Sequence, residues 1–299
     1  MVINKSQKNL RLLFPQWQAG INRPYVLGAH LLNFLAPKEK GVFEQVSLDE
    51  SNLDYQAGIY AKQAILNQTK EAKKLIQKHN PDSLVVLGGD CSVDLAPFAF
   101  LNEKYNGDTV LLWVDAHPDV SYDMKNHHSQ VLANLLGVGD RDFVKEVNKP
   151  LRPEQVLYVG LSDMLDALEL KEIKGMNLQS LSSEELDESK VLAWLKERQP
   201  THVMIHFDLD VLDMTEFRSI LPANPNKYEE YKEKIPRGTS MENIINVLQE
   251  VGRNYNVVGL GITEHFPWDA LYLKNMLERL PLIGDVTNTE RLKFNDPLE

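Results

Sequence analysis

Short apolar segments, each about the length of one β-strand, recur along the chain and are separated by longer segments of helical character. Several of them contain only apolar residues, as expected for strands that are covered on both faces. Strands that alternate with helices in this way predict the α/β class. We therefore expect three α/β/α layers around a mostly parallel, doubly wound sheet. The strand candidates are residues 11–14, 84–87, 110–114, 156–159, 203–207 and 257–260.

The chain of 299 residues is long enough for one large domain, and its composition changes sharply nowhere. We expect a single domain over residues 1–299. Residues 54–79 form a long amphipathic stretch, which predicts the first crossover helix. Residues 213–237 are rich in Pro, Asn, Lys and Glu, which predicts a long surface loop. Helix N-termini are expected at the capping-box pairs Ser182 with Glu185 and Thr239 with Glu242, and at Asp269.

Charge and cysteine content limit the classes of partner. The chain has 43 acidic and 32 basic residues, and a formal net charge of −11 argues against binding to a nucleic-acid backbone. No segment approaches the roughly 20 apolar residues of a membrane span, and the N-terminus lacks the pattern of a signal peptide. The single cysteine, Cys91, excludes an intramolecular disulfide and fits a reducing compartment. We expect a cytoplasmic protein that binds neither nucleic acid nor membrane.

Polar side chains follow four of the predicted strands at the point where each strand ends. The carboxyl ends of parallel strands meet at one edge of a sheet, so these side chains are expected to converge there. Carboxylates crowded into one site repel one another unless a cation is bound. The pattern therefore predicts a metal pair, with manganese favoured over zinc because most of the ligands are carboxylate oxygens. The candidate ligands are Asp115, His117, Asp119, Asp208 and Asp210, and Gly-Gly-Asp-Cys (88–91) and Glu264 follow the other two strands.

Six segments, taken together and in this order, resemble the arginase, agmatinase and formiminoglutamase family, the ureohydrolases. The similarity runs from about residue 84 to residue 267, over more than half of the chain. It implies an arginase-like fold, a binuclear manganese site and assembly into homo-oligomers. The segments are GGDCS (88–92), WVDAHPD (113–119), HSQVLANLLG (128–137), YVGLSD (158–163), HFDLDVLD (206–213) and ITEHFP (262–267).

The resemblance implies a role for each matching metal ligand. In this family, carboxylates bridge two manganese ions that hold a hydroxide between them. By position, Asp115 and Asp208 would bridge both ions, Asp119 would belong to the first ion, and His117 and Asp210 would belong to the second. The implied reaction is hydrolysis of a carbon–nitrogen bond in a small guanidino or amidino compound, by attack of the metal-bridging hydroxide.

The resemblance also implies which residues handle the substrate. Glu264 matches the carboxylate that pairs with a cationic guanidinium, and His128 matches a histidine that assists proton transfer. Asp119 is a second candidate for carrying a proton to the departing amine. Asn126, at a recognition position of the family, and Asp163 are the remaining substrate-binding candidates.

Cys91 departs from the family pattern, because better-known members have a histidine there as a ligand of the first ion. A thiolate is a softer ligand than imidazole and suits manganese poorly. Either Cys91 binds a softer divalent metal, or only one ion remains, or the cysteine is structural. The substrate pocket departs as well: only eight residues separate Asp119 from His128, and Met124 occupies a position that is polar in arginases. L-arginine is therefore not the expected substrate.

Two alternatives remain open from the sequence. The first is a non-catalytic or single-metal relative of the arginases that binds a small cationic ligand or a partner. The second is a zinc deacetylase-like enzyme, because the pair His127–His128 resembles the histidine pair of that class. The other histidines are expected to be structural or surface residues, with 202 and 206 facing away from the site or beneath it. They are His30, His79, His202 and His206.

Overall fold

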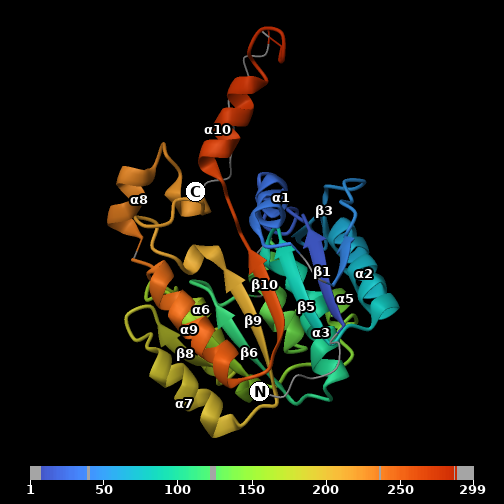
Figure 1. Cartoon of the computed structure of the whole chain (residues 1–299), viewed down its shortest axis with the longest axis vertical. Coiled ribbons are helices and arrows are strands. Elements are labelled where there is room, and N and C mark those ends of the chain that lie inside the picture. Colours follow the sequence, from blue (N-terminus) through green and yellow to red (C-terminus); the bar gives the residue numbers. More distant parts are fainter. Residues whose placement is uncertain (1–7, 39–40, 122–125, 236, 286, 288–299) are drawn as a thin grey trace.

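The computed structural model describes residues 8–38, 41–121, 126–235, 237–285 and 287. Within them, eight strands form one sheet in which every pairing is parallel (Figure 1). This sheet, with helices on both faces, confirms the expected α/β class. In spatial order the strands are β2 (Val42–Gln45), β1 (Asn9–Phe14), β5 (Ser83–Gly88), β10 (Val257–Thr263), β9 (His202–Asp208), β6 (Thr109–Val114), β7 (Val156–Leu161) and β8 (Gln179–Ser182).

All six strands expected from the apolar segments are present, and the two further strands of this sheet, which were not predicted, lie at its edges. β2 reads VFEQ and β8 reads QSLS, and both are largely exposed or half-buried. An edge strand packs on fewer neighbours, so it needs no continuous apolar run. The four strands that precede the candidate site residues, β5, β10, β9 and β6, are consecutive neighbours at the centre of the sheet. Their carboxyl ends therefore lie side by side.

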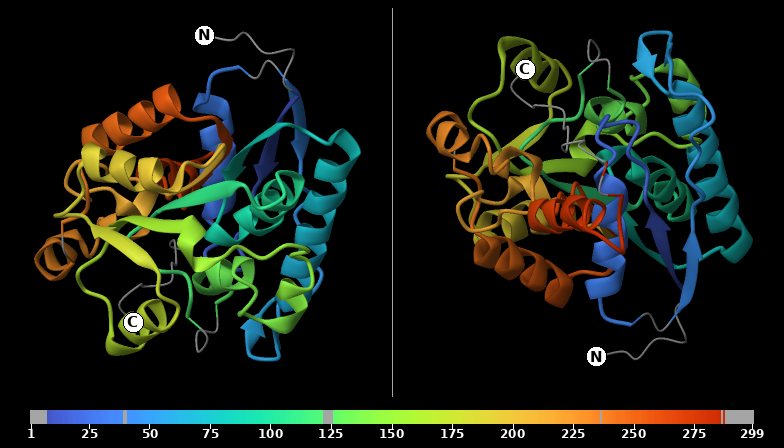
Figure 2. Two further views of the ribbon diagram at one scale, coloured as in Figure 1. Left: turned by 90° about the horizontal axis from the view of Figure 1, so that it is seen from below. Right: turned by 90° about the horizontal axis from the view of Figure 1, so that it is seen from above.

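Helices pack on both faces of this sheet and bury two large apolar clusters. One cluster includes Ile65 and Phe98 from α2 and α3, and the other includes Trp194 and Val247 from α7 and α9. Figure 2 shows these two pairs of helices on opposite sides of the sheet. The helices are α1 (Tyr25–Leu35), α2 (Lys62–His79), α3 (Leu95–Lys104), α4 (Val131–Leu135), α5 (Arg141–Val144), α6 (Ala167–Gly175), α7 (Glu188–Arg198), α8 (Tyr228–Lys234), α9 (Met241–Asn254) and α10 (Trp268–Leu277).

The predicted start of the first crossover helix is wrong, because α2 begins at Lys62 rather than at residue 54. The preceding residues form a short antiparallel hairpin of β3 (Tyr55–Gln56) and β4 (Ile59–Tyr60). Its turn, Ala57–Gly58, has positive φ values of 50° and 87°, which no helix can include. The amphipathic pattern therefore continues through a turn that interrupts the helix.

The predicted helix caps also shift. Ser240, not Thr239, caps α9, because its hydroxyl accepts a hydrogen bond from the backbone N–H of Asn243 at 3.3 Å. Asp187 caps α7, and Ser182 and Glu185 bond to each other's backbone N–H in the turn before it. Pro267 rather than Asp269 precedes α10.

Residues 213–237 are not a continuous loop. They include α8, whose Tyr231 is buried in the second apolar cluster. Figure 1 shows α10 projecting away from the body of the molecule. Among the residues that the structure describes, no helix is both long and apolar enough to cross a membrane.

Candidate metal centre and active site

Residues that follow the four central strands line one cavity of about 930 Å³. The cavity brings together most of the residues expected from the sequence. Asp115, at the end of β6, is completely buried outside this lining, and its Oδ1 lies 3.5 Å from Nδ1 of His117, which belongs to the lining. Asp163 is exposed and lies outside the lining, although its neighbour Ser162 belongs to it. The expected residues in the lining are Cys91, His117, Asp119, Asn126, His128, Asp208, Asp210 and Glu264.

Asp115 is the centre of a compact group of ligand atoms from two strands. Its Oδ1 accepts a hydrogen bond from the backbone N–H of His117 at 2.6 Å, and its Oδ2 accepts one from the indole of Trp113 at 3.0 Å. The Nδ1 of His117 lies 3.5 Å from Asp115 Oδ1 and 3.0 Å from Asp210 Oδ2. The Asp-x-His and Asp-x-Asp segments therefore converge as expected.

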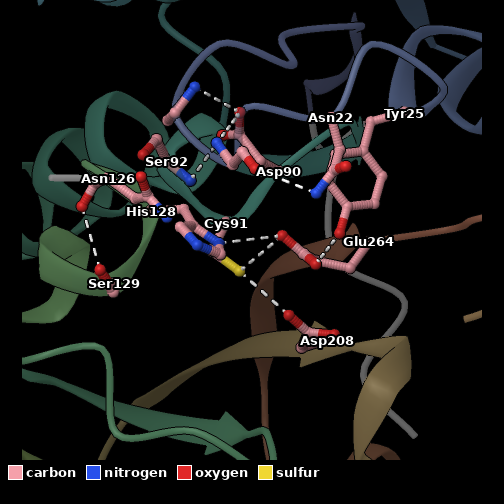
Figure 3. Close-up of polar contacts among 12 residues, drawn as sticks. Asn22, Tyr25, Asp90, Cys91, Ser92, Asn126, His128, Ser129, Asp208 and Glu264 are labelled. Carbon is pink, nitrogen blue, oxygen red and sulfur yellow. Dashed lines mark hydrogen bonds and ion pairs between the residues drawn. The ribbon is translucent and has the colours of Figure 1, made fainter. Parts of the chain in front are cut away.

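Asp208 connects this group to Cys91. Its Oδ1 accepts a hydrogen bond from the backbone N–H of Asp210 at 2.8 Å, and its Oδ2 accepts one from the Cys91 thiol at 3.0 Å (Figure 3). Cys91 follows Asp90, whose buried carboxylate accepts from the backbone N–H of Ser92 at 3.1 Å. That cap closes the turn after β5, and the thiol is only 2% exposed.

Glu264 forms the other side of the cavity and has three side-chain neighbours. Its Oε2 accepts a hydrogen bond from the hydroxyl of Tyr25, and its Oε1 lies 3.1 Å from His128 Nδ1 and 3.6 Å from Cys91 Sγ (Figure 3). The backbone of Glu264 has a φ of 62°, and its N–H donates to the carbonyl of Gly89 at 2.7 Å. Sequence reasoning missed Tyr25, because nothing in an apolar helix start distinguishes it from a core residue.

Asp119 is buried beside these groups but makes fewer contacts. Its φ is 48°, and among the described residues its Oδ2 has no hydrogen-bond partner. Asn126 faces the cavity, and its backbone carbonyl accepts a hydrogen bond from Ser129 Oγ at 3.0 Å. Met124, named above for the substrate pocket, lies outside the described residues.

His206 lies beneath the carboxylates and has an environment that the sequence did not reveal. It is completely buried, and its ring stacks on Trp113 with the ring centroids 3.7 Å apart. Its Nδ1 lies 2.8 Å from Asp94 Oδ2, and its Nε2 lies 3.7 Å from Asp115 Oδ2. The expected position beneath the site is confirmed. Its ring nitrogens, however, face carboxylates of the site and not an apolar core.

His127 points away from the cavity. Its Nδ1 lies 2.7 Å from Ser92 Oγ and its Nε2 lies 2.9 Å from Asn134 Nδ2, and its ring stacks on Phe143. Both ring nitrogens are occupied, so His127 and His128 do not form a pair at one metal ion. This geometry argues against the deacetylase-like alternative.

The electrostatics of the cavity favour a cation. Burial raises the pKa values of Cys91, Asp119, Asp208 and Asp210, and repulsion by neighbouring carboxylates raises those of Asp119 and Asp208 further. At Asp115 burial acts in the same direction, but the nearby imidazoles lower the pKa below its usual range. A bound cation stabilises every one of these anions at once.

Four overlapping groups of donor atoms could hold a metal ion, and within each group the atoms lie within 4.8 Å of one another. The donor set fits divalent cations, because buried oxygen and nitrogen atoms of Asp119, Asp210 and His206 have no hydrogen-bond partner among the described residues. The groups are Cys91, Asp115, His206 and Asp208; Cys91, His128 and Glu264; Asp115, His117 and Asp210; and Asp208, Asp210 and Glu264.

Known proteins share both the sequence pattern and the fold. The sequence is 26% identical to the arginase of Entamoeba histolytica over 195 residues (62% of each chain), and 26% identical to the arginase of Eremothecium gossypii over 197 residues (61% of this chain and 46% of that one). The matched regions thus span less than two thirds of these relatives' lengths.

Solved structures extend the likeness to most of the chain. The crystal structure of Entamoeba histolytica arginase in complex with L-ornithine has a TM-score of 0.72 at 20% identity, covering 87% of this chain and 91% of that one. Bacillus subtilis formimidoylglutamase has a TM-score of 0.65 at 14% identity, covering 89% and 82%. The sequence model of the arginase family matches residues 36–269. The chain therefore belongs to the arginase family.

Proposed function

We propose that this protein is a metal-dependent hydrolase that cleaves a carbon–nitrogen bond in a small guanidino or amidino compound. One observation carries the proposal. Donor atoms of Asp115, His117, Asp208 and Asp210 form overlapping groups that could hold metal ions, beside the cavity that the carboxylate of Glu264 lines. Such a reaction needs a site for divalent cations, and beside it an anionic group that can bind a planar cation.

Two ions would be held by the carboxylates that converge from β6 and β9. Asp115 and Asp208 would hold both ions, Asp119 would hold the first, and His117 and Asp210 would hold the second. We propose manganese as the metal of the oxygen-rich side and a softer divalent ion, zinc, where Cys91 contributes. When bound, the ions supply the Lewis acidity that activates water near neutral pH.

Glu264 would bind the cationic head of the substrate by charge-assisted hydrogen bonds. Beside it, burial lowers the pKa of His128, but the hydrogen bond and charge of Glu264 raise it to about 9. His128 is therefore protonated at neutral pH and is placed to give a proton to the departing amine. Asp119 is the second candidate for that transfer.

The rest of the cavity favours a substrate with a largely uncharged tail. Beyond the carboxylates, most of the lining surface is apolar, although polar side chains such as Arg237 and Ser162 also line it, and Asp163 is outside it. An α-amino acid tail such as that of L-arginine needs polar partners, because a buried charge without them is costly. We therefore propose a simpler alkyl guanidine or amidine. The apolar lining residues include Met164, Leu165, Met214, Ile220, Leu221 and Ile235.

The substitution Asp208→Ala tests the proposal. It removes a carboxylate that would contact both ions, so we expect metal content and turnover to be lost together. The measurements are elemental analysis of the purified protein and release of urea, ammonia or formamide from a panel of guanidines and amidines. Asp269→Ala is the matched control, because Asp269 is exposed in the first turn of α10. Full metal content in Asp208→Ala would contradict the assignment of Asp208 as a metal ligand.

The presence of Cys91 favours a second candidate, a single-metal or non-catalytic relative that binds a small cation. Calorimetric titration of the metal-loaded protein with the same panel separates the two. Binding without product for every compound supports the binder, whereas release of product supports the hydrolase. Assembly into a homo-oligomer is a further part of the proposal, to be measured by analytical ultracentrifugation.

A further inference from the structure

We propose that His206 is a direct metal ligand and completes a Cys91–Asp115–His206–Asp208 site that is selective for zinc. The inference rests on the proposed metal-dependent function but concerns the ligand set alone. The donor atoms of these four residues lie within 4.8 Å of one another, and all four side chains are buried. The imidazole would thus approach the ion from beneath, along the same face of the sheet as the two carboxylates.

The register of the sheet explains how His206 reaches the site. β6 and β9 are parallel neighbours, and Trp113 is the partner of His206 in their register. Side chains two residues apart on a strand share a face. Asp115 and Asp208 therefore lie one step further along the same face, directly above Trp113 and His206. The stacked indole holds the imidazole plane beneath the two carboxylates.

Asp94 fixes which nitrogen of His206 is free to bind. Its Oδ2 lies 2.8 Å from Nδ1, so a proton on Nδ1 is shared with this carboxylate and the lone pair is left on Nε2. Nε2 is completely buried, and no described residue forms a hydrogen bond with it. An imidazole that donates to a carboxylate through one nitrogen and binds metal through the other is a common arrangement in metalloproteins.

The place of Asp94 in the fold supports this role. It lies directly over Gly261 of β10, where the Cβ of any larger residue would come within 1.9 Å of Asp94 Oδ2. A strand residue without a side chain thus makes room for a buried carboxylate whose one side-chain hydrogen-bond partner among the described residues is His206. Burying a carboxylate costs free energy, and the hydrogen bond with His206 offsets part of that cost.

The chemistry of the four donors points to zinc. One thiolate, one imidazole and two carboxylate oxygens suit a tetrahedral zinc ion, in which neighbouring donors are separated by about 3.3–3.8 Å. The Cys91 Sγ to Asp208 Oδ2 distance is 3.0 Å and the His206 Nε2 to Asp115 Oδ2 distance is 3.7 Å. Small shifts of these side chains are enough to accept the ion.

The competing role for His206 is that of a permanent imidazolium, an internal cation that stabilises Asp94 and Asp115 without binding metal. X-ray absorption spectroscopy on the full chain loaded with one equivalent of zinc separates the two roles. The sample is the double variant His117→Gln/His128→Gln, which removes the other imidazoles of the cavity and leaves His206 intact. We expect one sulfur and one imidazole around zinc. Sulfur without imidazole overturns the proposal.

A second measurement uses His206→Gln, with His202→Gln as the matched control on the same strand. Zinc affinity is measured by competition with a chromophoric chelator. We expect the affinity of His206→Gln to fall by more than the roughly 10–100-fold that loss of an outer partner costs, and that of His202→Gln to be unchanged. Wild-type affinity in His206→Gln contradicts the proposal. If His206→Gln does not fold, the spectrum of the double variant decides.

Turnover by the wild type keeps this inference separate from the proposed function. Hydrolysis of a guanidine together with sulfur-only zinc coordination would overturn the ligand assignment and leave the function standing. Sulfur and imidazole coordination with no turnover of any compound in the panel would overturn the function and leave the ligand assignment standing.

Discussion

The thiol of Cys91 lies 3.0 Å from Oδ2 of Asp208. Both side chains are buried at the carboxyl edge of the sheet, Cys91 after β5 and Asp208 at the end of β9. Burial and the charge of Asp208 both raise the pKa of this thiol. A bound divalent cation would reverse that effect, because it stabilises the thiolate directly. We therefore expect the identity of the metal to depend on residue 91.

Replacement of Cys91 by histidine is expected to shift the metal preference from zinc towards manganese. Imidazole is a harder ligand than thiolate. The larger ring must fit a buried position, so we also expect a loss of about 1–3 kcal/mol in the free energy of unfolding. Metal competition followed by elemental analysis measures the preference. Cys91→Ser is the control, because it removes the thiolate without adding an imidazole; an equal shift in both variants would contradict the prediction.

Tyr25→Phe is expected to weaken substrate binding more than it slows the chemical step. The Tyr25 hydroxyl donates to Glu264, and without it the carboxylate loses one of the groups that orient it. Loss of a hydrogen bond to a charged group costs about 1.5–3 kcal/mol of stability. We expect a raised KM with a smaller change in kcat, measured by steady-state kinetics.

The matched control for that variant is Tyr105→Phe. Its hydroxyl donates to the carbonyl of Asp82 at 2.6 Å, and it lies outside the cavity lining. It should lose stability with KM unchanged. A KM for Tyr25→Phe equal to that of the wild type would show that Tyr25 does not orient the Glu264 carboxylate for substrate binding.

His127 is expected to make the stability of the protein depend on pH. Burial lowers the pKa of His127 to about 3, whereas the unfolded chain has an ordinary value near 6.5. Between these values the unfolded state binds the proton and the folded state does not. The contribution of His127 to stability should therefore be fully present above about pH 6.5 and fall as the pH decreases towards 3, by about 2 kcal/mol between pH 7 and pH 5.

The variant His127→Gln should remove this contribution, so its free energy of unfolding should change less between pH 7 and pH 5 than that of the wild type. Urea titrations at both pH values measure the difference. His30→Gln, at an exposed position of α1, should keep the wild-type slope. Parallel pH profiles for the wild type and His127→Gln would mean that His127 is not the group responsible.

Gly261→Ala is expected to disturb the support of the metal site from a distance. The new Cβ would come within 1.9 Å of Asp94 Oδ2 and would displace the carboxylate that holds His206. We expect a loss of about 1–3 kcal/mol of stability from overpacking, together with weaker zinc binding. Urea denaturation and chelator competition measure the two effects.

Gly252→Ala provides the control for that substitution. Gly252 lies in α9, and a Cβ at this position would have no other atom within 4 Å. Replacement of an exposed helical glycine by alanine stabilises a protein by about 0.5–1 kcal/mol. Zinc binding should be unchanged in this variant, and a similar loss of zinc in both would contradict the link between Gly261 and His206.

Much of the fold could be predicted from the sequence, because strands such as β6 and β7 are buried throughout and almost entirely apolar. β8 could not, because an edge strand has no such pattern. The start of α2 was misplaced for a different reason. Amphipathic periodicity says which face of a segment is buried, but a left-handed turn such as the one at Ala57 interrupts a helix without changing that periodicity.

The sequence by itself determined the sheet class and most of the residues that line the cavity, because polar residues that follow apolar strands must lie at the sheet's carboxyl edge. Only the tertiary structure decided their supporting contacts. Tyr25 and Glu264 are 239 positions apart, and Asp94 and His206 are 112 apart. Contacts at such separations arise from strand order and register, which bring buried side chains together with no local signal at either position. The same register brings Nε2 of His206 beneath Asp115.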